Sequence, residues 1–376
     1  MASNKRKNER FQPPAKNLPS HGDRQNTYQE ASEREFIFKE HAFPEHTVDL
    51  GEIRMNYAVA GSISDPAILL IPSQAESWWG YEDAMRLLSE SYQVYAVDLR
   101  GQGRSTWTPG RYTLDNLGHD LVRFVDFVIR RPVIVSGLSS GGVLAAWMSA
   151  FAKPGQVLAC VCEDPPLFSS ELTPAVGHSI RQSIAGPIFK IWHKWLGSQW
   201  SVGDIDGMHH AMAHELPSWM PRAMAALMAE TKIAPMPPDL KEYDPEWAEA
   251  FWSGSVGAGC DHENMLKQVK VPVLLTHHYR RVDPESGCLA GAISDRQVEH
   301  VKKLVEGSGN SFTYESFPQM PHSMHDHDPA CYVATVTAWI EERGFGKAFR
   351  PLNDKPSKEQ TGKWKTRLWS ELAGDD

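Results

Sequence analysis

The chain has 376 residues, of which 41% are hydrophobic and 23% charged, and these proportions exclude a wholly disordered or a fibrous protein. Its 38 lysines and arginines against 47 aspartates and glutamates give a net charge of −9, so we expect no nucleic-acid partner and no docking on an anionic membrane. The five cysteines are an odd number without a CxxC motif, which argues against a disulfide framework and favours a cytoplasmic location.

The first 35 residues are polar and rich in charge. Such a segment cannot bury enough apolar surface to offset the entropy lost on ordering, so we predict a disordered tail over residues 1–35. Its basic start lacks the apolar run of a secretory signal. No stretch of the chain approaches the roughly 18 apolar residues that a membrane span requires.

Apolar runs and helical patterns then alternate along the chain. We predict strands over residues 54–60, 67–71, 93–99, 132–136, 157–162, 271–277 and 312–317. Helices are predicted over residues 81–91, 114–129, 143–151, 294–306 and 329–342. Several strands are apolar throughout, as is typical of strands buried on both faces of a parallel sheet. The alternation therefore predicts an α/β fold with a mostly parallel central sheet flanked by helices.

The region from residue 165 to about residue 260 contains no convincing strand. We interpret residues 165–265 as a helical cap, or lid, inserted into a core made of residues 36–164 and 266–343. Large aromatic side chains suit a flat apolar ligand, although they can equally serve to pack the cap on the core. Six of the 13 tryptophans lie in this region: Trp192, Trp195, Trp200, Trp219, Trp247 and Trp252. After the core, residues 344–376 are predicted to be a second tail, in which residues 364–372 could form a short helix.

The candidate nucleophile is Ser139, in the G-x-S-x-G motif that runs from Gly137 to Gly141. The motif lies between a predicted strand and a predicted helix, as a nucleophile elbow requires. The two glycines leave room for a tight turn that lifts the serine hydroxyl above the sheet. The helix N-terminus then directs backbone amides at developing negative charge. The alternative is a glycine-rich turn that carries no chemistry.

Two backbone N–H groups are candidates for an oxyanion hole. One is that of Ser140, directly after the nucleophile. The other should come from the loop after the second predicted strand, where Gln74 is the expected donor. In the turn that follows the next strand, Asp98 and Arg100 are expected to brace the backbone.

The candidate general base is His322, which follows the last predicted strand and precedes the last predicted helix. Its rivals are His325 and His327. Three histidines and two aspartates crowd into residues 322–328, so a zinc site is an alternative for this segment. We favour the catalytic base and expect neither a metal nor another cofactor.

Three carboxylates are candidates for the acid that orients His322. Asp164 comes first, because it follows the strand at 157–162 and Pro165 ends that strand. Asp283 and Glu163 are the alternatives. The alternative for Asp164 is a carboxylate that only caps a turn.

These motifs resemble the α/β-hydrolase superfamily and, within it, the bacterial and fungal zearalenone lactone hydrolases. The resemblance covers about residues 36–343. It is carried by the elbow and by SWWGYE at 77–82, VDLRGQGRSTWTP at 97–109, CEDPP at 162–166, LKEYDPEW at 240–247 and PHSMHDHDP at 321–329. It implies an acid after the sixth strand, which fits Asp164.

The resemblance also implies a substrate and a reaction. The substrate would be an apolar macrocyclic resorcylic acid lactone, opened by Ser139 through an acyl-enzyme. Trp192, Trp195 and Leu138 are expected to contact it, and the protein could form a homodimer.

Other activities use the same catalytic residues. They are a general carboxylesterase, a carbon–carbon bond hydrolase, a cofactor-free haloperoxidase and a non-enzymatic ligand receptor. Epoxide hydrolase and dehalogenase chemistry is disfavoured, because those enzymes place aspartate at the elbow, where this chain has Ser139.

Overall fold

The computed structural model describes residues 41–197, 203–220 and 242–345. The predicted tail at 1–35 and the predicted helix at 364–372 lie outside these residues, as does Trp200. All the predicted catalytic residues lie inside them.

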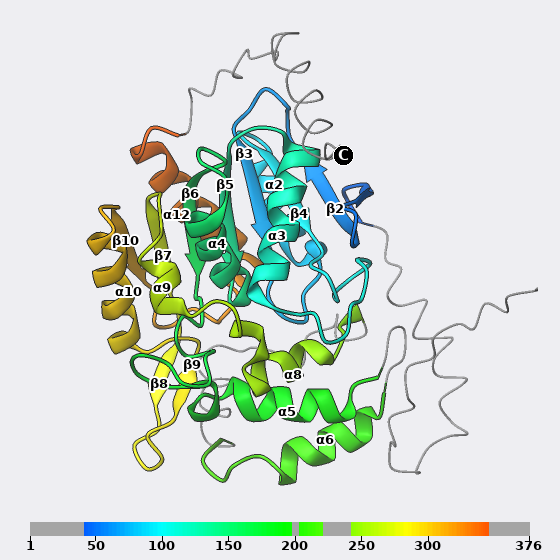
Figure 1. The fold of residues 1–376 in the computed structure, drawn as a ribbon, viewed down its shortest axis with the longest axis vertical. Coiled ribbons are helices and arrows are strands. Elements are labelled where there is room, and N and C mark those ends of the chain that lie inside the picture. Colours follow the sequence, from blue (N-terminus) through cyan, green and yellow to red (C-terminus); the bar gives the residue numbers. More distant parts are fainter. Residues whose placement is uncertain (1–40, 198–202, 221–241, 346–376) are drawn as a thin grey trace, which may run out of the picture.

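An eight-stranded sheet forms the centre of the molecule (Figure 1), with the strand order β1-β2-β4-β3-β5-β6-β7-β10. From β4 to β10 neighbouring strands are parallel, whereas β2 is antiparallel to both β1 and β4. The strands are β1 (Glu45–Asp49), β2 (Arg54–Ala60), β3 (Ala67–Ile71), β4 (Gln93–Val97), β5 (Val133–Leu138), β6 (Val157–Glu163), β7 (Val273–His277) and β10 (Phe312–Ser316). All seven predicted strands are present, which confirms the predicted α/β class.

Helices cover both faces of the sheet, and each face has its own apolar cluster. In β3, Leu69 and Ile71 point into one cluster, while Ile68 and Leu70 point into the other. The first cluster is covered by α3 (Leu114–Phe124), α4 (Ser140–Phe151) and α10 (Asp295–Gly307), and the second by α2 (Glu82–Leu88) and α12 (Pro329–Glu342). The alternation along a fully buried strand explains why the strand reads as continuously apolar.

Three short strands and the bounds of several helices differ from the sequence-based prediction. The pattern missed β1, β8 (Arg280–Val282) and β9 (Leu289–Gly291), which are short and in part polar. The predicted helix at 114–129 is α3 followed by a π-helical turn, η2 (Val125–Ile129), which ends at Arg130 with φ 56°. Helix α4 begins at Ser140 instead of residue 143, so it starts directly after the candidate nucleophile.

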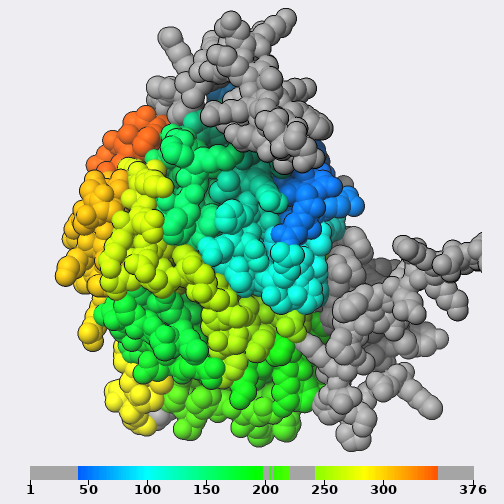
Figure 2. All heavy atoms as spheres, in the orientation of Figure 1, coloured from blue at the N-terminus to red at the C-terminus, as the bar shows by residue number. Residues whose placement is uncertain are grey.

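After β6 the chain leaves the sheet and returns to it at β7. The segment between them, here called the cap segment (residues 165–265), contains α5 (Ala185–Trp195), α6 (Ile205–His214), α8 (Glu246–Ser253) and all but the last residue of α9 (His262–Leu266). Helices α5, α6 and α8 lie together beyond one end of the sheet (Figure 1, and Figure 2 in the same orientation). Within the described residues, no helix combines the length and apolar character needed to cross a bilayer.

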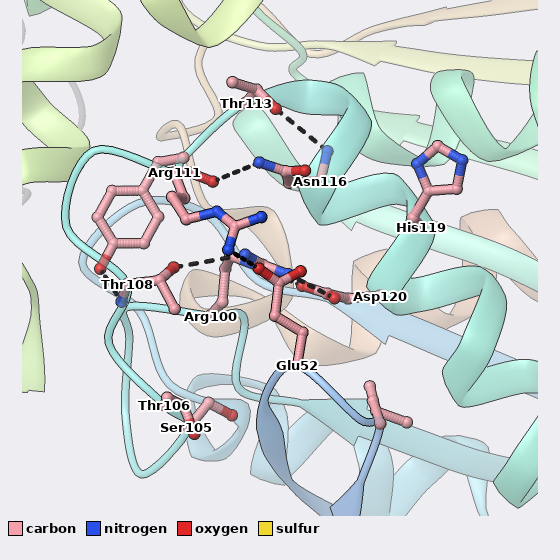
Figure 3. A network of polar contacts seen from close by, with 12 residues as sticks. Glu52, Arg100, Ser105, Thr106, Thr108, Arg111, Thr113, Asn116, His119 and Asp120 are labelled. Carbon is pink, nitrogen blue, oxygen red and sulfur yellow. Dashed lines mark hydrogen bonds and ion pairs between the residues drawn. The ribbon is translucent and has the colours of Figure 1, made fainter.

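A buried arginine fixes the loop after β4 to both the core and the cap segment. Arg100 is 1% exposed and donates two hydrogen bonds to Asp120, of 2.5 and 2.7 Å, and one of 3.3 Å to Glu52 (Figure 3). Its carbonyl oxygen accepts the indole N–H of Trp247 in α8 at 2.7 Å. Asp98 accepts a further backbone N–H from Trp78 at 2.7 Å. Both residues therefore brace the loop, as the sequence suggested.

Candidate active site

Ser139 lies at the sharp turn between β5 and α4. Its backbone dihedrals are φ 54° and ψ −120°, a combination that costs energy in a residue with a side chain. The turn is tight because strand and helix approach closely at the two glycines. A Cβ on Gly137 would lie 2.2 Å from the carbonyl oxygen of Gly141, and a Cβ on Gly141 would lie 2.2 Å from that of Ile71. Close backbone contact therefore requires glycine at both position 137 and position 141.

The two expected oxyanion donors lie at the same end of the sheet. Ser140 is the first residue of α4, and the first N–H groups of a helix have no partner within it. Strand β3 pairs with β5 so that Ile71 is opposite Gly137, and this pairing brings the loop that carries Gln74 beside the elbow. The Gln74 side chain accepts a hydrogen bond of 2.6 Å from Tyr243 OH in the cap segment.

The structure brings His322 and Asp164 together. His322 Nδ1 lies 2.7 Å from Asp164 Oδ2, while Asp164 Oδ1 accepts the backbone N–H of His278 at 3.1 Å. The carbonyl oxygen of Glu163, one residue before Asp164, accepts the N–H of Ser139 at 2.8 Å. The candidate nucleophile and the candidate base are thus both attached to the end of β6.

The pKa values of Asp164 and His322 are shifted in opposite directions. Burial alone would raise the pKa of Asp164, but the hydrogen bond from His322 and the nearby histidines lower it below its ordinary value of 3.8. Burial alone would lower the pKa of His322, but the hydrogen bond and charge of Asp164 raise it above 6.5. Asp164 therefore stays ionised and favours a proton on the imidazole.

The rival acids have other partners. Asp283 Oδ2 accepts hydrogen bonds from the backbone N–H and the hydroxyl of Ser286, at 2.8 and 2.7 Å. Glu163 binds His325, with 2.9 Å between Oε2 and Nδ1. Among the three open candidates, Asp164 is the carboxylate hydrogen-bonded to His322.

The histidine-rich segment does not gather around one point. His325 is completely buried, whereas His327 is exposed. In the part of the chain that the structure describes, no group of three histidine, cysteine or acidic side chains is arranged to hold a metal ion.

The predicted ligand-contacting residues lie in three different settings. Leu138 is buried, and its N–H donates to Tyr81 OH at 3.1 Å. Trp192 packs edge-on against Tyr243, with 5.8 Å between ring centroids. Tyr243 is in turn hydrogen-bonded to the Gln74 side chain, so it links Trp192 to Gln74. Trp195 packs within the cap segment, where a Cβ on Gly207 would lie 2.4 Å from its ring.

Sequence reasoning missed a second group of charged residues, His325, Glu163 and Glu76, beside the pair of His322 and Asp164. His325 lies between Glu163 and Glu76, with 2.7 Å between His325 Nε2 and Glu76 Oε1. Two adjacent carboxylates, Glu163 and Asp164, and two histidines three residues apart were visible signals for paired contacts. Glu76 carries no local signal, since it lies 249 positions from His325.

The family and sequence comparisons agree with this arrangement. The profile of the alpha/beta hydrolase family matches residues 68–335. The 3-oxoadipate enol-lactonase 2 of Acinetobacter baylyi is 26% identical over 103 residues, which are 27% of this chain and 39% of that protein. Epoxide hydrolase 4 of Homo sapiens is 31% identical over 108 residues, which are 28% of this chain and 30% of that protein. The chain thus matches well under half the length of these curated relatives.

Solved structures are similar over most of the chain. The enol-lactonase from Burkholderia xenovorans LB400 has a TM-score of 0.53 at 17% identity and covers 79% of this chain and 100% of its own. The E-2-(acetamidomethylene)succinate hydrolase has a TM-score of 0.52 at 17% identity and covers 80% of this chain and 99% of its own. At these identities the likeness concerns the fold, and it confirms the predicted α/β-hydrolase fold.

Proposed function

Because the chain belongs to the alpha/beta hydrolase family, we propose that it is a serine hydrolase that cleaves carboxylic esters or lactones through an acyl-enzyme. The observation that carries the proposal is the 2.7 Å hydrogen bond between His322 and Asp164, at the strand end to which Ser139 is also attached. Ser139 acts as nucleophile, His322 as general base and Asp164 as the acid that orients the base.

The proposed reaction has two halves. Asp164 accepts the Nδ1–H of His322, which leaves the Nε2 lone pair to take the proton of Ser139 as its oxygen bonds to the carbonyl carbon. The N–H groups of Ser140 and Gln74 stabilise the tetrahedral oxyanion. His322 then gives the proton to the leaving alkoxide. In the second half it activates a water that releases the acid from Ser139.

For the substrate we propose a macrocyclic resorcylic acid lactone of the zearalenone type. The support is the resemblance of five sequence strings to zearalenone lactone hydrolases, together with the aromatic residues of the cap segment. Trp192 is 8% exposed, and its indole N–H has no hydrogen-bond partner among the described residues. A flat lactone with polar groups suits such a surface. In this proposal the cap segment is the lid over the site. A homodimer and a cytoplasmic location remain predictions.

Epoxide hydrolase names also occur among the relatives. Attack on an epoxide by a serine hydroxyl would form an ether, which water does not cleave under mild conditions. A carboxylate nucleophile would form an ester, which water can cleave. The hydroxyl at position 139 therefore favours an ester or lactone substrate.

The test is incubation of the full chain with zearalenone, followed by mass spectrometry. With the wild type we expect a product heavier than zearalenone by one water, or a lighter product that has gained one water and lost one carbon dioxide. We expect neither product with Ser139→Ala. Short p-nitrophenyl esters and an aryl epoxide are assayed in parallel.

The parallel substrates separate the possible failures. Turnover of p-nitrophenyl esters without turnover of zearalenone would reject the lactone and leave a general esterase. Turnover of any ester by Ser139→Ala at the wild-type rate would reject the serine mechanism. Binding of zearalenone without a mass change would indicate a receptor.

A further inference from the structure

Three residues after the proposed base, His325 is buried between two carboxylates. Its Nδ1 lies 2.9 Å from Glu163 Oε2 and its Nε2 lies 2.7 Å from Glu76 Oε1. The side chains of His325 and Glu163 are 0% exposed and that of Glu76 is 12% exposed. Because an ionised carboxylate can only accept hydrogen bonds, both ring nitrogens must carry hydrogen, so the ring is an imidazolium.

The surroundings of His325 favour this charged state. Burial alone would lower the pKa of His325, but the charges of both glutamates raise it to about 10. The ring also stacks on Tyr81, with 3.6 Å between ring centroids. The titratable groups that face it from the neighbouring elements are Glu163, Glu76, Tyr81, Tyr332 and Asp326.

One side of the cluster fixes the segment that carries the proposed base. Glu163 Oε1 accepts the backbone N–H groups of Met324 and His325, at 2.7 and 3.1 Å. These residues begin the short helix α11 (Met324–His327), which starts two residues after His322. The base segment is therefore attached to β6 by Glu163 and His325, independently of the bond between His322 and Asp164.

The other side of the cluster fixes the loop of the proposed oxyanion donor. Glu76 Oε2 accepts the N–H of Ser73 at 2.7 Å and so closes the turn around Gln74. Glu76 is pressed against the backbone that follows, since a Cβ on Gly80 would lie 2.6 Å from its Oε1. His325 is thus bonded to the carboxylate that shapes this turn.

Tyr81, on which the ring stacks, adds two contacts to the same region. It ends the short helix η1 (Trp78–Tyr81), and its hydroxyl donates to the carbonyl oxygen of Ile71 at 3.2 Å. The same hydroxyl accepts the N–H of Leu138, the residue before the nucleophile, at 3.1 Å. Tyr81 therefore contacts the segment that carries His322 (through His325), the end of β3 from which the Gln74 loop starts, and the end of β5 before Ser139.

We propose that His325, bound at both ring nitrogens, is a positioning residue that sets the oxyanion loop relative to the base segment. The inference rests on the proposed serine hydrolase function. His325 touches no reacting atom in this scheme and acts through Glu76 on the turn around Gln74. Through Glu163 it acts on the segment that carries His322.

The sharpest test is Glu76→Gln, with Glu82→Gln as its matched control. A glutamine at position 76 has one acceptor oxygen in place of two, so it cannot accept the His325 proton and the Ser73 N–H at separate oxygens as Glu76 does. The bond between His325 and Glu163 survives. Glu82 is also bonded to a histidine, with 3.3 Å to His41 Nδ1, but it lies outside this cluster. The readouts are reaction with a fluorophosphonate probe and p-nitrophenyl acetate hydrolysis, corrected for active sites by burst titration.

We expect Glu76→Gln to lower kcat about 10- to 100-fold with KM changed less than about threefold, since loss of a whole oxyanion donor costs about 10²–10³. The pH profile gives a second signature. The charge of Glu76 raises the pKa of His322, so its removal should move the ascending limb of kcat/KM to lower pH. His325→Gln should lower kcat at least as much, and Glu82→Gln should match the wild type in both respects.

The outcomes separate this inference from the function beneath it. Absence of probe labelling in the wild type would reject the serine hydrolase. Suppose instead that the probe labels the wild type, and that Glu76→Gln and Glu82→Gln have the same kcat per active site and the same ascending limb of kcat/KM against pH. That result would overturn the positioning role. If His325→Gln does not fold, Glu76→Gln still decides the question.

Discussion

His322 and Asp164 are hydrogen-bonded to each other, yet they differ greatly in exposure. The His322 side chain is 40% exposed, whereas that of Asp164 is 1% exposed. The imidazole can therefore exchange protons with substrate and water, while the carboxylate is held in a fixed, desolvated position. Asp164 also accepts the His278 N–H, so a neutral replacement should change the tautomer of His322 more than its location.

The first prediction follows from this pairing. Asp164→Asn should lower kcat about 10³- to 10⁴-fold on p-nitrophenyl acetate, because an amide N–H facing Nδ1 favours the wrong tautomer. Asp283→Asn, at the alternative acid, should retain wild-type kcat, because Asp283 is bonded to Ser286. Steady-state kinetics measure both variants. The reverse ranking would assign the acid to position 283.

At the residue scale, the sequence proposed Ser139, His322 and Asp164 and ranked Asp164 above Asp283 and Glu163, but it gave no contact that decides among the three carboxylates. Glu163 and Asp164 are adjacent, so spacing alone does not distinguish them. Only the fold shows that Glu163 faces His325 and Asp164 faces His322. The contact of Glu76 could not be predicted for a different reason, because its partner His325 is distant in the chain.

At the element scale, the elbow depends on backbone contact between three elements. Helix α4 begins directly at Ser140, and Gly141 touches the end of β3. The predicted strands 54–60 and 67–71 matched β2 and β3 at both ends. For β3 the reason is its apolar run of five residues, which is buried throughout. The short strands β1, β8 and β9 were missed, because strands of only three to five residues are held by pairing that a local pattern does not reveal.

The contact at Gly141 gives the second prediction. Gly141→Ala would place a Cβ 2.2 Å from the carbonyl oxygen of Ile71 and 2.6 Å from that of Pro72. We expect a lower Tm and a fall in kcat of at least about tenfold, because the loop of the oxyanion donor must move. Gly307→Ala, whose Cβ would meet no atom within 4 Å, should leave both unchanged. Thermal unfolding and ester hydrolysis check the pair, and an unaltered Gly141→Ala would contradict the geometry.

At the scale of the whole molecule, buried ionisable groups set the pH dependence of stability. Burial raises the pKa of Glu171 and Glu242 from 4.5 to about 7. The folded state then holds more protons than the unfolded state between these values, so this stability is lost as pH rises through 7. The stability from charged His325, present below pH 6.5, is lost as pH rises through about 10. His262 opposes them, because burial lowers its pKa to about 4 and its contribution is lost as pH falls from 6.5 to 4.

The third prediction is that Tm falls by several degrees between pH 6 and pH 9.5. Glu242→Gln should reduce this fall, because glutamine can still accept the hydrogen bond of 2.9 Å from Ser77 and has no charge to bury. Its stabilising effect at pH 9 is expected to be on the order of 1–3 kcal/mol. Calorimetry of both proteins across this range provides the measurement. A Tm that rises with pH above 7 would show that other groups dominate.

The adjacency of Glu163 and Asp164 restricts how this chain can vary over evolutionary time. Neighbouring carboxylates serve His322 and His325, so the interval between the two histidines is fixed by the interval between their acids. A codon gained or lost anywhere between positions 322 and 325 would leave at least one acid without its imidazole. Insertions and deletions should therefore be absent between residues 322 and 325 in related proteins that keep both pairs. They should occur in other parts of the molecule.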